Sequence, residues 1–191
     1  MKKVLGKKIK PVIIGIGGRS CSGKSTVVKK IEEKYNRKFL CINQDSFFKI
    51  NAPNNWENPD SLRFDKLINS IKDLKNGKKT YIPNHRCTEV FDREVKPHKI
   101  IIVEGFLLFI NKKLNKLFDK KIWVDVSDLN ILYRRLKRSN NLKKIDYIMS
   151  VIIPESKKYE YQQKKEADII IDGNKSEDDI IMCVEKQIKK Y

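Results

Sequence analysis

Five short apolar runs recur along the sequence and predict the strands of a sheet. They cover residues 12–16, 38–43, 99–103, 121–126 and 168–172, and isoleucine and valine are their commonest residues. Apolar runs without strict alternation of apolar and polar residues are typical of strands that are buried on both faces. The pattern therefore predicts a mainly parallel, five-stranded sheet with helices on both of its faces.

Segments with helical periodicity separate most of these runs. The clearest extends from residue 61 to about residue 75, with leucine and isoleucine on one face, and an Asn-Gly pair ends it. A capping box, Ser-Glu-Asp-Asp at 176–179, opens the last helix. Further helices are predicted over residues 27–35, 128–138 and 147–165.

Two segments lack either periodicity. Residues 51–60 are rich in asparagine and proline, and residues 80–98 are polar, mixed and interrupted by proline, so both are expected to lie outside the sheet. The two histidines, His85 and His98, lie in the second segment and receive no catalytic role. The alternation of strands and helices, without a linker or repeat, predicts an α/β fold with a single domain over residues 1–191.

A glycine-rich loop follows the first predicted strand. Residues 18–25 fit the pattern G-x-x-x-x-G-K-[ST], in which inward-pointing backbone N–H groups hold phosphate oxygens. Lys24 is expected to reach the β- and γ-phosphates, and the Ser25 hydroxyl to bind Mg²⁺. The alternative, a glycine-rich turn with a surface lysine, does not explain the strand before the loop and the helix after it. The residues predicted to bind the phosphates of ATP are Gly18, Ser20, Ser22, Gly23, Lys24, Ser25 and Thr26.

Two acidic residues follow later strands. Asp45 comes after the second predicted strand and Glu104 directly after the third. Ligands of such sheets bind beyond the carboxyl ends of the strands, so Asp45 is expected to face the phosphate loop. Glu104 is either a solvated strand end or a Mg²⁺ ligand together with Ser25, and the phosphate loop favours the second interpretation.

Composition limits the cellular setting and the partners. No apolar run is long enough to span a membrane, and the basic N-terminus lacks the apolar region of a signal peptide. The cysteines at 21, 41, 87 and 183 are scattered, which argues against a disulfide framework or zinc site and predicts a reducing, cytoplasmic setting. The oligomeric state is left open.

The net charge of +18 allows two interpretations, a nucleic-acid-binding surface or a general bias of composition. Lysines are spread along the whole chain, and the sequence contains no nucleic-acid-binding motif. The second interpretation is therefore favoured, and no specific nucleic-acid partner is expected.

Three classes of phosphate-loop protein compete. A GTPase would need a D-x-x-G segment, which is absent, and residues 174–177 read N-K-S-E instead of N-K-x-D. A nucleic-acid-stimulated ATPase would need a longer chain. A small-molecule kinase needs an acid for the acceptor hydroxyl, an acid for Mg²⁺ and a basic lid, and Asp45, Glu104 and the basic residues of 134–144 supply them. A kinase is the main prediction, and a non-kinase NTPase is a weaker alternative.

Several segments resemble the uridine kinase and nicotinamide riboside kinase group of nucleoside kinases, over nearly the whole chain. Residues 44–48 (Gln-Asp-Ser-Phe-Phe) resemble the Q-D-x-F-[FY] motif of this group, and residues 103–109 resemble its E-G-[FI]-L-L-F segment. Residues 55–62 resemble its segment of an aromatic residue, an acid and a proline, and Arg135 and Arg138 match two arginines of its lid.

This resemblance implies a P-loop kinase fold with a short lid at about residues 139–150. It implies that Asp45 is the base toward a ribose 5′-hydroxyl, with Lys24 and Arg138 as the other catalytic residues. The implied acceptor site comprises Asp45, Phe48, Trp56, Glu57, Arg135 and Tyr147, in which Trp56 stacks on the base and Glu57 binds the ribose diol. The implied cofactor is Mg²⁺, with ATP as the phosphoryl donor.

The signals for the two subfamilies are divided. Residues 76–83 resemble an insertion of uridine kinases, whereas residues 55–62, 104–109 and 172–177 resemble nicotinamide riboside kinases. Uridine kinases carry a Y-D-[FY]-x-x-H pattern after a proline equivalent to Pro83 and an R-G-R in the lid, and both are missing here. In nicotinamide riboside kinases, a tyrosine at the position of Tyr147 completes an aromatic pair around the base, although a packed tyrosine is the other interpretation. Nicotinamide riboside, giving nicotinamide mononucleotide, is therefore predicted as the acceptor, with uridine or cytidine as the alternative.

Overall fold

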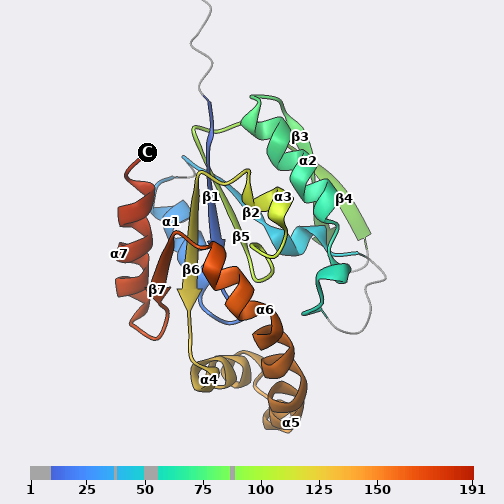
Figure 1. Ribbon diagram of the computed structural model, residues 1–191, viewed down its shortest axis with the longest axis vertical. Helices are drawn as coiled ribbons and strands as arrows, with labels where there is room; N and C mark the ends of the chain where they lie inside the picture. Colours follow the sequence, from blue (N-terminus) through green and yellow to red (C-terminus); the bar gives the residue numbers. More distant parts are fainter. Residues whose placement is uncertain (1–9, 37, 50–55, 87–88) are drawn as a thin grey trace, which may run out of the picture.

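Five parallel strands form the central sheet (Figure 1). The computed structural model describes residues 10–36, 38–49, 56–86 and 89–191. Within these residues the strand order is β2–β5–β1–β6–β7, and every neighbouring pair is parallel. The strands are β1 (Val12–Gly17), β2 (Leu40–Asn43), β5 (Ile100–Gly105), β6 (Lys120–Asp125) and β7 (Ile169–Asp172). All five predicted strands and the α/β architecture are confirmed.

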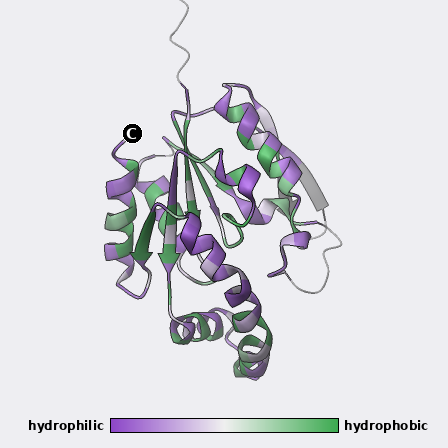
Figure 2. Cartoon of the chain, viewed as in Figure 1, coloured by the Kyte–Doolittle hydropathy of each residue, from purple (hydrophilic) through white to green (hydrophobic). Residues whose placement is uncertain are grey.

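Helices cover both faces of the sheet. Successive residues of a strand point to opposite faces, so each strand contributes side chains to two cores. Ile14 and Ile102 belong to a core that also contains α1 (Lys24–Lys34) and α7 (Glu177–Ile188). Ile13 belongs to a second core, on the opposite face, with α2 (Phe64–Lys75) and α3 (Lys112–Asn115). The apolar strands between more polar helices are visible in Figure 2.

The segment over residues 80–98 is more regular than predicted. It forms an antiparallel hairpin of β3 (Thr80–Arg86) and β4 (Glu89–Val95), which lies outside the main sheet as expected. Its buried Ile82 and Val95 join the core of α2. A hairpin strand needs only one hydrogen-bonded neighbour, so it tolerates the proline that concealed the strand in the sequence.

The helix boundaries differ from the prediction only locally. The predicted helix from residue 61 begins at Phe64, because a 3₁₀ turn, Pro59–Ser61, precedes it. Ser176 caps α7 as predicted, since its hydroxyl accepts the N–H of Asp179 at 3.2 Å. The turn-rich segment 51–60 is described only from residue 56.

A helical arm, residues 128–153, lies beyond the carboxyl ends of the strands (Figure 1). It consists of α4 (Asp128–Ser139), a 3₁₀ turn (Leu142–Lys144), α5 (Ile145–Tyr147) and a π-helical segment (Ile148–Ile152) that continues into α6 (Ile153–Glu166). Val126, Ile131, Ile148 and Ile152 give the arm its own small core, separate from the two cores of the sheet.

Two further features concern the setting of the chain. Among the described residues, no helix is long and apolar enough to cross a membrane. Cys21, Cys41 and Cys183 are free thiols, and Cys87 lies outside the described residues.

Candidate active site

The phosphate loop connects β1 to α1 and has an unusual backbone. Cys21 and Gly23 adopt left-handed conformations, with φ of 63° and 96°. Such conformations reverse the chain within few residues and are rare for a residue with a side chain. The N–H of Ser22 donates to the carbonyl of Arg19 at 3.0 Å, which closes the loop, and α1 begins at Lys24. The positive end of α1 therefore points into the loop, as anion binding requires.

The side chains of the loop point in different directions. Lys24 is buried, and its ammonium donates to the carbonyl of Arg19 at 3.1 Å. The Ser22 hydroxyl is also buried, behind the loop, where a Cβ atom on Gly18 would approach it to 2.6 Å. Gly18 therefore has no room for a side chain. Gly23, Lys24, Ser25 and Thr26 line a cavity of about 350 Å³, here called the donor cavity.

Ser25 and Glu104 meet at the end of the sheet. The Ser25 hydroxyl donates to Oε2 of Glu104 at 2.9 Å. Glu104 lies on β5, where it is buried and pairs in register with Ile16 of β1. The parallel register thus places this carboxylate beside the first turn of α1. The two oxygens are of the kind that Mg²⁺ prefers, and Mg²⁺ needs few protein ligands when phosphates supply the others.

Asp45 follows β2 and is held at this edge by its neighbour Gln44. The fully buried amide of Gln44 accepts the N–H of Leu107 at 3.0 Å. A Cβ atom on Gly105 would come within 2.2 Å of that same amide, so only glycine fits there. The motifs over residues 44–48 and 103–109 therefore pack against each other, which fixes Asp45 near the end of β5.

The pKa values of two carboxyl groups in the cleft are raised. Desolvation raises the pKa of Asp45 above its usual value, although Lys24 and Arg138 partly offset this effect. Burial likewise raises the pKa of Glu104, and the charge of Asp45 adds to it, while Lys24 and the hydrogen bond from Ser25 act against it. Asp45 is nevertheless exposed to solvent, whereas Glu104 is buried. The acids and Lys24 therefore act on one another within one site.

A second cavity is lined entirely by residues of the helical arm. It has a volume of about 490 Å³ and is here called the arm cavity. The residues that line it are Arg135, Arg138, Ser139, Lys143, Lys144, Tyr147 and Ile148. Arg138 also lines the donor cavity, so the two cavities meet at this side chain.

An ion pair joins the arm to the segment that precedes α2. Nη2 of Arg135 donates to Oε1 of Glu57 at 3.0 Å, and both side chains are largely buried. Burial raises the pKa of Glu57, while Arg135 and the more distant Lys24 lower it. The pair thus fixes the predicted ribose-binding acid against α4.

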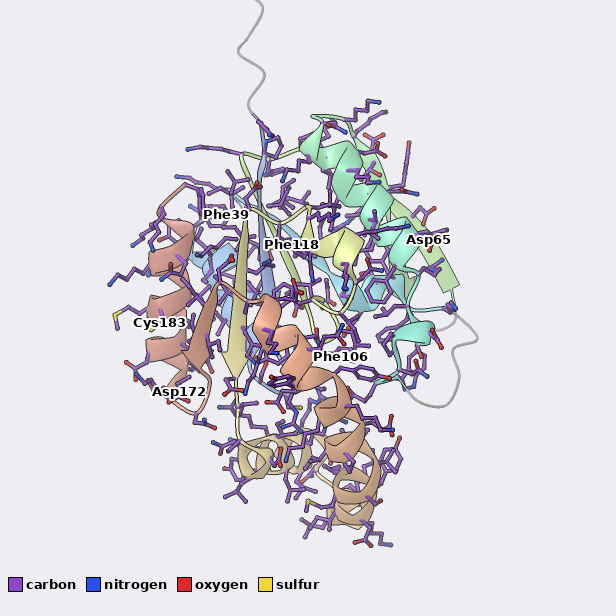
Figure 3. The ribbon with its side chains drawn as sticks, in the orientation of Figure 1. Phe39, Asp65, Phe106, Phe118, Asp172 and Cys183 are labelled. Atoms are coloured by element: carbon purple, nitrogen blue, oxygen red, sulfur yellow. The ribbon has the colours of Figure 1, made fainter. Side chains whose placement is uncertain are left out.

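The predicted aromatic residues lie in two places. Trp56 is half-exposed and packs edge-on against Phe48, with ring centroids 5.0 Å apart. Phe48 also contacts Phe106, whose position beside α6 is labelled in Figure 3. Tyr147 instead lines the arm cavity and is half-exposed. The contacts of the described residues do not bring Trp56 and Tyr147 together.

Two arginines have structural contacts that the sequence analysis did not predict, since it counted Arg134 only among the basic residues of the lid and assigned no role to Arg19. Arg134 donates to the carbonyls of Cys21 and Ser22 at 3.2 and 3.1 Å, and to that of Gly173 at 2.8 Å. It therefore ties the phosphate loop to the turn after β7. Arg19 is buried behind the loop and binds the helices of the arm. Neither role could be read locally, because the partners are more than 100 residues away along the chain, except Gly173.

No group of three or more His, Cys, Asp or Glu side chains among the described residues could hold a metal ion by itself. The residues 174–177, which approach a guanine-reading motif in sequence, have structural contacts instead. Oδ1 of Asn174 accepts the N–H of Ser127 at 3.0 Å, and Ser176 caps α7. This segment therefore serves as a turn and a helix cap, as predicted.

Several known proteins are similar in sequence to this chain. The profile of the phosphoribulokinase / uridine kinase family matches residues 44–179. Uridine kinase of Chlamydia pneumoniae is 32% identical over 201 aligned positions, which cover 94% of this chain and 90% of that protein. Uridine-cytidine kinase A of Dictyostelium discoideum is 34% identical over 179 positions, which cover 84% of this chain and 36% of that longer protein.

The fold is shared with proteins of low sequence identity. Phosphoribulokinase from Rhodobacter spheroides superposes with a TM-score of 0.63 at 16% identity, covering 87% of this chain and 73% of that one. At this level of identity, the likeness concerns the fold alone. The two chains therefore share the arrangement of a parallel sheet with helices on both faces.

Proposed function

Because the chain belongs to the phosphoribulokinase / uridine kinase family and is a phosphotransferase, we propose that it transfers the γ-phosphoryl group of ATP to the ribose 5′-hydroxyl of a pyrimidine nucleoside. The observation that carries this proposal is the position of Arg138, which lines the donor cavity and whose charge also acts on Asp45, the proposed base. A group that passes from donor to acceptor would pass this guanidinium. The charge that spreads over a transferring phosphoryl group needs such a partner.

The donor side of the proposed reaction rests on the phosphate loop. The backbone N–H groups of the loop and the ammonium of Lys24 bind the phosphates of ATP, and a phosphate oxygen takes the place of the Arg19 carbonyl at Lys24. Ser25 and Glu104 hold Mg²⁺, since their oxygens lie 2.9 Å apart at the mouth of the loop. When bound, the ion would neutralise part of the negative charge on the phosphates of ATP.

The acceptor side rests on Asp45. Its carboxylate accepts the proton of the 5′-hydroxyl as the phosphoryl group arrives, and its raised pKa makes it a stronger base than an ordinary aspartate. The positive charges of Lys24 and Arg138 lower this pKa again in part, which favours the ionised carboxylate that accepts the proton. The helical arm is the lid, with Arg135 and Glu57 fixing its position over the acceptor. Phe48 and Trp56 form an apolar wall for the base.

The choice of acceptor differs from the ranking made on the sequence. The relatives described above are uridine and uridine-cytidine kinases, which favours the pyrimidine alternative over nicotinamide riboside. The preference for nicotinamide riboside is not supported by these comparisons. The pyrimidine-reading pattern after Pro83 is nevertheless absent, so we propose that other residues recognise the base.

A coupled assay of ADP release tests this proposal. The purified chain is incubated with Mg·ATP and, separately, with uridine, cytidine, nicotinamide riboside, adenosine or ribulose 5-phosphate. We expect uridine or cytidine to give the highest kcat/KM, at least tens of times that for nicotinamide riboside. Better turnover of nicotinamide riboside would restore the earlier ranking, and turnover of ribulose 5-phosphate alone would show a sugar-phosphate kinase. ATP binding without turnover of any acceptor would contradict the proposed function.

A further inference from the structure

Arg19 is a charged residue in an unexpected place, inside the phosphate loop. Its side chain is 3% exposed and is not among the residues that line the donor cavity. It therefore points away from the site where phosphates are expected. An arginine is seldom buried unless its donors are paired, so the partners of this side chain define its purpose.

The guanidinium of Arg19 contacts two helices. Nε and Nη2 donate to the hydroxyl of Ser156 at 3.0 and 2.9 Å, and Nη2 also donates to the carbonyl of Ile153 at 3.3 Å. Nη1 donates to Oδ1 of Asp128 at 2.5 Å and lies 3.6 Å from Oε2 of Glu160. One rigid fork thus satisfies acceptors on both α4 and α6.

These partners stand at the two ends of the helical arm. Asp128 is the first residue of α4, and Ile153 is the first residue of α6, directly after the π-helical segment. The arm between them packs on its own small core. The arm is therefore a packed unit of its own, and Arg19 contacts both of its ends.

The main chain of Arg19 faces the opposite way. Its carbonyl accepts hydrogen bonds from the ammonium of Lys24 and from the N–H of Ser22. A bound phosphate competes with this carbonyl for Lys24. The same residue therefore contacts the phosphate-binding lysine through its backbone and both ends of the arm through its side chain.

We propose that Arg19 is a positioning residue that couples phosphate binding in the loop to the placement of the helical arm, and with it of Arg138, over the donor phosphates. It acts through the arm and touches no reacting atom. The inference rests on the proposed phosphoryl transfer from ATP, but not on the identity of the acceptor. Misplacement of Arg138 would slow the transfer while leaving the loop able to bind nucleotide.

The surrounding charges make Arg19 variants testable. Asp128 also pairs with Lys157 at 2.5 Å, and Glu160 also pairs with Lys164 at 3.0 Å. The Ser156 hydroxyl keeps its own bond to the carbonyl of Ile153 at 3.0 Å. Both carboxylates therefore retain a cation when Arg19 is replaced, and the chain is expected to fold.

Two substitutions separate the charge of Arg19 from its shape. Arg19→Gln removes the charge, whereas Arg19→Lys keeps it but cannot reach both helices with one compact ammonium. We expect kcat to fall about 10- to 100-fold in Arg19→Gln and less in Arg19→Lys, since small misplacements can cost up to about 100-fold. The matched control is Lys157→Met, which removes an exposed partner of the same Asp128 and should leave kcat unchanged.

A second measurement does not depend on turnover. Binding of a non-hydrolysable Mg·ATP analogue is followed by calorimetry, and hydrogen exchange is followed over residues 139–152. In the natural chain, the analogue should slow exchange in the arm. In Arg19→Gln, the dissociation constant should change less than about 3-fold, well under the effect on kcat, and the slowing should disappear. Ser156→Ala, which removes two acceptor contacts of Arg19, should reduce the slowing in the same direction.

Several outcomes would overturn the inference. A lower melting temperature in Arg19→Gln with unchanged kcat and unchanged protection of the arm would show a purely structural role. Absence of protection in the natural chain would also overturn it, while leaving the kinase function intact. Failure of the natural chain to bind the analogue would contradict the proposed function itself.

Discussion

The donor side and the acceptor side of the cleft are built in different ways. The donor cavity takes most of its lining from one continuous stretch, residues 21–27, and presents backbone groups and the N-terminal end of α1 for the proposed binding of phosphates. The acceptor side uses side chains from separate elements, with Asp45 after β2, Glu57 before α2 and Arg135 on α4. The donor site therefore depends on the local conformation of the chain, and the acceptor site depends on distant contacts.

The two sides also differ in charge. The donor side presents the positive end of α1 together with Lys24, Arg134 and Arg138. The proposed acceptor side and metal position hold three acids, Asp45, Glu57 and Glu104, against the single arginine Arg135, and desolvation raises the pKa of each acid. Perturbed carboxyl groups that cluster in a cleft are typical of functional sites. Substitutions on the two sides should therefore affect different kinetic parameters.

The largest expected effect comes from Asp45. Asp45→Asn keeps the size of the side chain but removes the proton acceptor, so kcat should fall about 10²- to 10⁴-fold. The affinity for Mg·ATP should change little, because the phosphate loop is unaltered. Steady-state kinetics and calorimetric titration with a non-hydrolysable analogue check both expectations. The matched control is Asp60→Asn, an exposed acid in the neighbouring 3₁₀ turn.

The pH profile gives a second check on Asp45. Desolvation raises the pKa of Asp45 above the usual aspartate value of about 3.9. As the pH is lowered, kcat of the natural chain should therefore begin to fall at a pH above that value. The loss occurs on the acid side because only the ionised carboxylate accepts a proton. Asp45→Asn should lack this limb. A variant with near-normal kcat and the same acid limb would assign the base to another residue.

The contrast between the two sides also explains what the sequence could predict. The sheet was predictable because buried strands need continuous apolar runs, and the donor site because its residues are adjacent in the chain. The pairs Arg135–Glu57 and Arg19–Asp128 span 78 and 109 residues, and nothing local encodes them. The acceptor ranking relied partly on residues 172–177, which turn the chain and cap α7. A cap is needed whatever the acceptor is, so these residues carry little information about it.

The next effect concerns Glu104 and the metal. Glu104→Gln keeps a partner for the Ser25 hydroxyl but removes the carboxylate charge. The concentration of free Mg²⁺ that gives half-maximal activity should rise about 10- to 100-fold, the range seen when groups near a metal are replaced. Activity is measured against free Mg²⁺ at saturating ATP. An unchanged Mg²⁺ requirement would leave Glu104 as a purely structural acid.

A smaller effect is expected from Trp56 on the acceptor side. Stacking of a base on an aromatic ring contributes about 1–3 kcal/mol, and half-exposed Trp56 should lie at the lower end. Trp56→Leu should therefore raise KM for the nucleoside and leave KM for ATP unchanged. The control is Tyr161→Leu, another exposed aromatic residue, on α6. Equal rises in KM for the nucleoside and in KM for ATP would show that Trp56 does not act specifically on nucleoside binding.

The smallest effect concerns the thiols, and it distinguishes the proposed donor side without any substitution. Cys21 lines the donor cavity, whereas burial and the nearby charges of Glu32 and Glu104 raise the pKa of Cys41 to about 12. The thiolate is the reactive form, so Cys41 should react slowly at neutral pH. Brief iodoacetamide treatment, mapped by mass spectrometry, should therefore label Cys21 before Cys41, and more than Cys87 or Cys183.

Mg·ATP should suppress this labelling, because bound phosphates cover the loop and place negative charge beside the sulfur. Cys183, which lies on α7 away from the loop, is the internal control and should react equally with and without nucleotide. Labelling of Cys41 ahead of Cys21, or labelling of Cys21 that nucleotide does not change, would mean that the Cys21 thiol does not face the bound phosphates.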